Sequence, residues 1–181
     1  MAINFSGGQQ NAPSALIQVQ AWHLNTIHSS NSNQSAWYDF IGAGNNYGIT
    51  LKRDNSTIIL HQSLNMDQNG GSTGHFYRWL YRIGTGGSWT SFNNAVNTGS
   101  NRRIIHHGMD GDQSNDMRHR AHRQILTTSS AAGTTFFFKL QSYLIPGAAY
   151  IKINHANNDN DTTSNARGSS YIFLEEYSNP T

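Results

Sequence analysis

Short β-rich segments recur along this chain with turn-forming residues between them, and none keeps the 3.6-residue period of an amphipathic helix. The clearest is HFYRWLYRI at positions 75–83, in which the aromatic residues at 77, 79 and 81 alternate with positions that include Arg78 and Arg82. A period of two places alternate side chains on opposite faces of a strand. About nine or ten such segments, spaced by turns, predict a single all-β sandwich or barrel.

The expected strands cover most of the chain. The segment 117–129 is open to either a strand or a short helix, and Tyr47–Ser63 predicts a β-hairpin that turns at Asp54 and Asn55. The first 13 residues, which include Phe5, show no period and predict an extended N-terminal arm before a single domain at 14–181. The remaining expected strands are 14–24, 36–42, 75–83, 102–107, 134–145, 150–154 and 169–177.

Composition narrows the classes of function. Charged residues make up 12% of the chain, the formal net charge is +2, and only three residues are Lys, so a nucleic-acid partner is not expected. Cysteine is absent, which excludes disulfides and thiolate metal sites. No apolar run approaches ~18 residues and the N-terminus lacks a secretory pattern, so we expect no membrane partner and synthesis in a cytoplasm.

The sequence also lacks the motifs of common enzymes. It contains no GxSxG, P-loop or GxGxxG pattern. The adjacent carboxylates Glu175 and Glu176 would face opposite sides of a strand and could not act as a glycosidase pair by themselves. We therefore expect no enzymatic activity, no catalytic residues and no cofactor.

Four segments carry a resemblance to a known family. They are SALIQVQAWHL, NNYGITLKRDNSTI, TTFFFKLQSYLIPGAAYIKIN and NARGSSYIFLEEYS, in that order. Together they resemble small β domains in structural proteins of tailed phages, over about residues 14–177. The chain departs from that pattern between Asn65 and Asp116, where it is longer and richer in Trp, Tyr and His.

The resemblance implies an antiparallel jelly roll of about 8–10 strands, similar to tumour-necrosis-factor-like heads and usually a homotrimer displayed on a virion. The length leaves no room for a fibre shaft, which favours a capsid decoration or cement protein. The expected partners are further copies of the chain and the major capsid protein. The alternative is a receptor-binding fibre tip that recognises host glycans, and a third hypothesis is a cellular carbohydrate-binding jelly roll unrelated to phage.

One segment, Arg102–Leu126, concentrates five of the nine arginines, four of the nine histidines and three acidic residues. Within it, RHRAHR (Arg118–Arg123) as a strand would place Arg118, Arg120 and His122 on one face. Together with Phe5, the arginines Arg118, Arg120 and Arg123 are candidate contacts to the capsid or to another subunit; the alternative is a solvated face.

Oxygen-bearing residues at Asp110, Asp112 and Asp116 resemble the spacing of a calcium loop, but the Gly at offset 6 and the Glu at offset 12 are missing. A plain polar loop is the favoured interpretation, and we expect no metal. In the long loop after residue 83, Trp89 and Phe92 are candidate exposed aromatics that would stack on sugars or fill a subunit interface.

Overall fold

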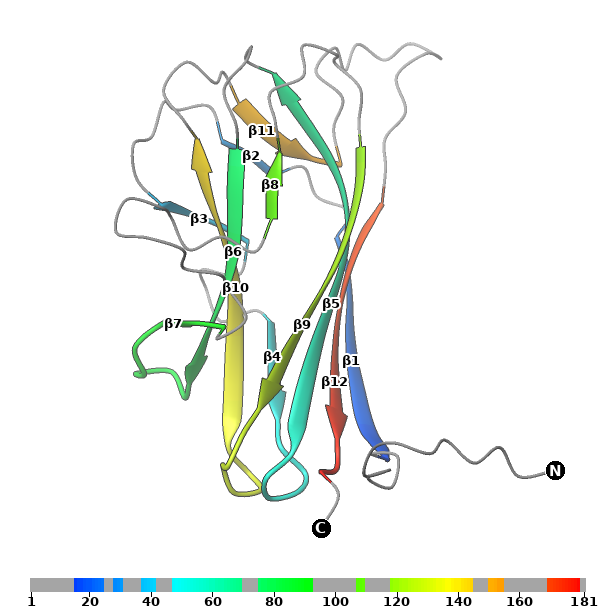
Figure 1. Ribbon diagram of the computed structural model, residues 1–181, viewed down its shortest axis with the longest axis vertical. Coiled ribbons are helices and arrows are strands. Elements are labelled where there is room, and N and C mark those ends of the chain that lie inside the picture. Colours follow the sequence, from blue (N-terminus) through cyan, green and yellow to red (C-terminus); the bar gives the residue numbers. More distant parts are fainter. Residues whose placement is uncertain are drawn as a thin grey trace, which may run out of the picture.

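The computed structural model describes residues 15–24, 28–30, 37–41, 47–69, 75–92, 107–109, 118–144, 150–154 and 169–179. Within these ranges the chain forms twelve β-strands arranged as two facing sheets (Figure 1). The described part contains no helix that could cross a membrane. The all-β prediction is therefore confirmed, and the segment that was open to a strand or a helix is a strand.

The first sheet has six strands. In spatial order these are β1 (Leu16–Leu24), β12 (Ser170–Tyr177), β5 (Thr57–Asn69), β11 (Tyr150–Ile153) and β2 (His28–Ser30), with β9 (Arg118–Thr127) also paired to β5. The second sheet follows β3 (Trp37–Ile41), β10 (Thr135–Leu144), β6 (His75–Ile83) and β7 (Thr90–Ser91), with β4 (Tyr47–Thr50) on β10 and β8 (His107–Met109) on β6.

Several short strands act as two halves of one longer strand because they pair along the same neighbour. β3 and β4 share β10, β7 and β8 share β6, and β11 and β12 share β5, while β1 and β2 pair with β12 and β11. Counting each such pair once leaves eight strands in the order 1-8-3-6 and 2-7-4-5. This is the order of a jelly roll, in which two Greek keys form a double-layered sandwich, so the predicted fold is confirmed.

The core lies between the two sheets. Strand alternation sends every second side chain inward, and the buried set is dominated by branched and aromatic residues that fill this layer. The largest fully buried side chains are Trp79, Phe92, Phe136, Phe138, Ile41, Ile49, Leu51, Ile58, Leu60, Leu64, Met66 and Leu140.

The predicted hairpin at 47–63 is wrong in its pairing. β4 pairs with β10 in the second sheet, whereas β5 belongs to the first. The connection through Asp54 and Asn55 therefore crosses from one sheet to the other. Alternation and turn residues look the same in a hairpin and in such a crossing, because both place two half-buried strands on either side of a turn.

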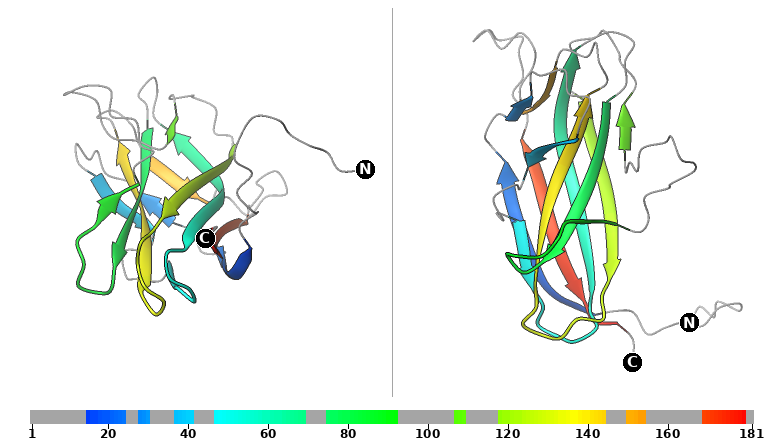
Figure 2. Two further views of the ribbon diagram at one scale, coloured as in Figure 1. Left: turned by 60° about the horizontal axis from the view of Figure 1, so that its bottom comes forward. Right: turned by 90° about the vertical axis from the view of Figure 1, so that its left-hand side faces the viewer.

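Two crossing connections support one another at one end of the sandwich. Residues 51–56 run beside residues 128–134, with hydrogen bonds from Leu51 N to Thr134 O (2.9 Å), Gly133 N to Leu51 O (2.8 Å) and Asn55 N to Ser130 O (2.9 Å). Figure 2 shows both connections at the end where β12 also finishes. The first described residue lies there too, because Ser178 N donates to Ala15 O at 3.0 Å.

A buried carboxylate holds the first of these connections. Glu176 has no exposed surface and accepts hydrogen bonds from Lys52 N (3.0 Å), Arg53 N (3.1 Å), Ser56 Oγ (2.7 Å) and Gln18 Nε2 (2.5 Å). Its burial raises the pKa, but these hydrogen bonds outweigh the burial and leave the pKa of Glu176 below its ordinary value. The carboxylate thus serves as the acceptor for two backbone N–H groups of this connection, those of Lys52 and Arg53.

Candidate interaction surfaces

The outer side of the first sheet presents apolar and aromatic side chains where a solvated antiparallel sandwich usually shows polar ones. Val19 is 45% exposed, Tyr171 40% and Ile125 50%. These positions alternate along their strands with core residues such as Ile172 and Leu174, so they point away from the second sheet. We call this the aromatic face; it comprises Val19, His23, Ile59, Tyr171, Phe173 and Ile125.

Three rings form a stacked series on the aromatic face. The rings of His23 and Tyr171 lie 4.9 Å apart at 15°, and those of Tyr171 and Phe173 lie 6.1 Å apart at 12°. Register explains this arrangement, since His23 on β1 pairs directly with Tyr171 on β12. Large, rigid side chains of this kind are enriched in the cores of protein interfaces.

A polar cluster lies beside the aromatic rings. His61 Nε2 and Tyr177 Oη contact Glu175 Oε2 at 2.9 Å and 3.1 Å. Glu175 therefore faces outward while Glu176 is buried, which confirms the prediction that the two carboxylates lie on opposite faces.

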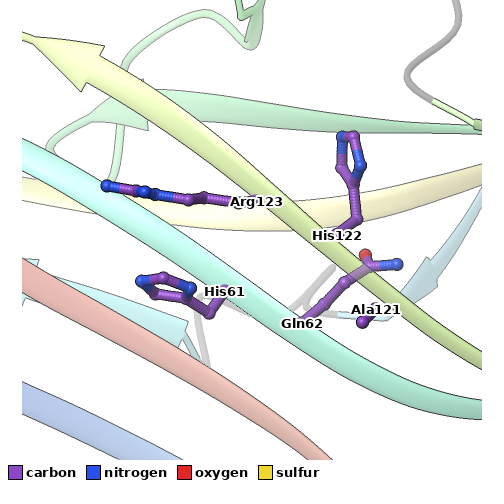
Figure 3. A pocket seen from close by; sticks show the side chains of 5 residues that line it. All are labelled: His61, Gln62, Ala121, His122 and Arg123. Atoms are coloured by element: carbon purple, nitrogen blue, oxygen red, sulfur yellow. The ribbon is translucent and has the colours of Figure 1, made fainter.

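An open hollow of about 460 Å³ lies over β5 and β9 (Figure 3). It is lined by His61, Gln62, Ala121, His122 and Arg123.

The candidate arginines of β9 divide between the two sides of the first sheet. Arg123 is exposed and pairs in register with His61, on the outer side. Arg120 and His122 are half-buried and lie on the side that faces the second sheet, and position 118 occupies the same register face. Burial lowers the pKa of His122, which favours its neutral form.

The expectation that Phe92 is exposed is wrong. Only 1% of Phe92 is exposed, and its ring packs 5.9 Å from Phe138 and 5.4 Å from Tyr81. The physical reason is that the chain folds back after residue 83, so that β7 pairs with β6 and carries Phe92 into the core. Trp89 stays outside, with Arg82 and Lys139 over its ring at 4.7 Å and 4.5 Å.

The outer side of the second sheet carries a connected set of charged and aromatic groups that sequence analysis missed. We call it the Arg78 row; it consists of Trp37, Arg78, Gln141, Asp39, Lys139 and Trp89. The alternation in segment 75–83 did place Arg78 and Arg82 opposite the aromatic residues. Their partners come from β3 and β10, and which strands are neighbours was not readable from the sequence.

The remaining candidates cannot be placed. Phe5, Asp110, Asp112 and Asp116 lie outside the described residues. Among the residues that the structure does describe, no three His, Asp or Glu side chains lie close enough to hold one metal ion.

The fold and its two outer faces define a jelly-roll sandwich with one aromatic and one basic sheet surface. No family model matches the chain, and no curated protein matches it. Solved structures similar to it include that of infectious bursal disease virus Gx strain, with TM-score 0.40, 9% identity and coverage of 92% of this chain and 40% of that one. The infectious bursal disease virus VP2 subviral particle is similar at TM-score 0.39 and 9% identity, with 90% and 42% covered. The chain thus spans about two fifths of their length, and the jelly-roll assignment rests on its own strand order.

Proposed function

We propose that the chain is a non-enzymatic virion structural protein that forms a homotrimer and decorates the outer capsid shell of a tailed phage. The observation that carries the self-association is the aromatic face. Its exposed Val19, Tyr171 and Ile125 leave apolar area in water at a cost of about 25 cal/mol per Å². Exposed apolar patches of this kind mark interaction sites.

A second copy of the chain is the occupant that this face suits. The surface is a sheet face with an open hollow over β5 and β9, and its outward-facing Glu175 and Arg123 offer both charges to a partner. Closed cyclic symmetry buries such a surface on every subunit and leaves no open end. The sequence resemblance to trimeric phage jelly rolls supports three copies.

We assign attachment to the shell to the arm at residues 1–13, with the major capsid protein as the partner of the arm. Ala15 lies at the end of the sandwich where β12 finishes. The arm is therefore joined to the domain at that end. Deleting residues 1–13 should abolish attachment and leave the trimer intact; unchanged attachment would count against the role of the arm.

Immunogold electron microscopy of virions, with antibody against this chain, tests the location. Gold spread over the heads would support decoration of the shell. Gold confined to the tail or to fibre ends would favour the glycan-binding alternative. Of the two aromatic residues proposed to contact glycans, Phe92 is buried and only Trp89 lies outside the core. Unlabelled virions would refute both roles.

A further inference from the structure

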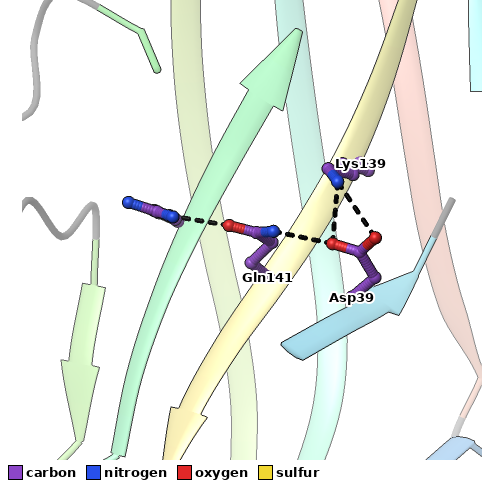
Figure 4. Close-up of polar contacts among 4 residues, drawn as sticks. Asp39, Lys139 and Gln141 are labelled. Carbon is purple, nitrogen blue, oxygen red and sulfur yellow. Dashed lines mark hydrogen bonds and ion pairs between the residues drawn. The ribbon is translucent and has the colours of Figure 1, made fainter. Parts of the chain in front are cut away.

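The Arg78 row holds one arginine in a fixed orientation. The Arg78 guanidinium lies 4.1 Å from the centre of the Trp37 ring, and its Nε donates to Gln141 Oε1 at 2.8 Å. Gln141 Nε2 in turn donates to Asp39 Oδ1 at 2.7 Å, and Lys139 Nζ lies 2.8 Å from the same oxygen. In Figure 4, Lys139 and Gln141 contact the Asp39 carboxylate from different sides. Stacking and a chain of hydrogen bonds therefore fix the guanidinium plane.

Asp39 serves this scaffold and leaves no carboxylate for the outer part of Arg78. Its burial raises the pKa, but hydrogen bonds from Lys139 and Gln141, with the charges of Lys139 and Arg78, hold the pKa of Asp39 below its ordinary value. Among the described residues, no acceptor contacts either Nη group of Arg78. Within the part of the chain that the structure describes, the terminal N–H donors of the guanidinium thus remain available.

The charge on this side of the molecule favours an anion. The described strands of the second sheet carry three permanent cations, Arg78, Arg82 and Lys139, and only one carboxylate, Asp39. A planar guanidinium fork matches a carboxylate with two parallel hydrogen bonds. Because the side chain is already held, binding costs less conformational entropy than it would for a free arginine.

We propose that Arg78 binds a carboxylate side chain of the shell protein, so that the outer side of the second sheet docks on an acidic surface of the capsid. The inference rests on the proposed decoration function. A protein carboxylate is favoured over an acidic sugar because sugars stack on bare aromatic rings. Here Arg78 lies over Trp37, and Arg82 and Lys139 lie over Trp89.

The test measures binding of the full chain to purified shells assembled without it, by co-sedimentation over a protein titration. Arg78→Gln removes the charge and the fork, and should weaken binding about 10-fold or more. Arg78→Lys keeps the charge, loses the fork and should recover only part of the affinity. Arg53→Gln removes one exposed cation from the connection between β4 and β5 and should bind as the unmodified chain does. Thermal melting and molar mass of each variant confirm that fold and assembly are retained.

The outcomes separate the two proposals. If the unmodified chain binds shells and Arg78→Gln binds equally well, the Arg78 assignment is refuted while the decoration function stands. If the unmodified chain does not bind shells, both fail. A parallel titration with sodium glucuronate covers the other source of carboxylate: binding that is lost in Arg78→Gln would assign the site to an acidic sugar and overturn the protein partner.

Discussion

At the scale of single residues, Glu176 shows how a charged group stabilises the interior of an all-β domain. Its carboxylate accepts hydrogen bonds from two backbone amides, a hydroxyl and an amide side chain. No cation is needed, since four donors surround the charge. The sequence LEEY revealed only that one of the two glutamates would face inward, and it did not reveal which donors would meet it.

Glu176→Gln should destabilise the fold in a pH-dependent way. The folded-state pKa of Glu176 is lower than the ordinary value of 4.5, so its contribution is complete above that value and is lost as the pH falls through the folded-state pKa. We expect a loss of about 3 kcal/mol in the free energy of unfolding at pH 7, shrinking in acid. Urea unfolding at a series of pH values measures both. A difference that does not change with pH would contradict this role.

Phe92 and Trp89 are near neighbours in sequence with opposite environments. Phe92→Ala should cost about 3–5 kcal/mol because it leaves a cavity in the core. Trp89→Ala should cost about 1 kcal/mol, the worth of its contacts with Arg82 and Lys139. Chemical denaturation of the two variants measures both losses in the free energy of unfolding. Equal losses would mean that the loop does not fold back as described.

At the scale of elements, the connections between the sheets depend more on particular residues than the strands that they join. Asn55 has a φ of 54°, in the left-handed region that Asn and Gly adopt more readily than other residues. Asn55→Gly should therefore leave the melting temperature nearly unchanged. Asn55→Ala should cost about 1 kcal/mol, since Ala gains a steric clash and loses no side-chain contact that the structure records. Thermal melts of both variants compare the two; a Gly variant as unstable as the Ala variant would refute the backbone explanation.

The strands themselves were readable from alternation. Segments 75–83, 134–145 and 169–177 became β6, β10 and β12 almost as expected. Pairing was not readable: β4 and β5 flank a turn yet lie in different sheets, and β7 is too short to show a period. The Arg78 row joins positions 39, 78 and 141, which meet only because β10 lies between β3 and β6. The side-chain pattern along the sequence indicates which face of a strand each residue occupies. Which strands lie side by side in a sheet depends on the topology of the whole chain.

At the scale of the whole molecule, the two outer sheet faces divide the proposed functions. The aromatic face is assigned to self-association and the Arg78 row to the shell. Tyr171→Lys should dissociate the trimer, because it places a charge in an apolar interface. Tyr38→Lys is a matched control, since Tyr38 is 43% exposed against 40% for Tyr171 but lies on β3 of the second sheet. Light scattering of both variants tests the assignment; a trimer that survives Tyr171→Lys would refute the role of the aromatic face.

The molar mass of the unmodified chain in solution, measured by size-exclusion chromatography with multi-angle light scattering, tests the central claim most directly. The account predicts a single species at three times the chain mass of 20.1 kDa, stable on dilution to micromolar concentration. A species with the mass of one chain at every concentration would contradict it, because the aromatic face would then be stable in water without a partner.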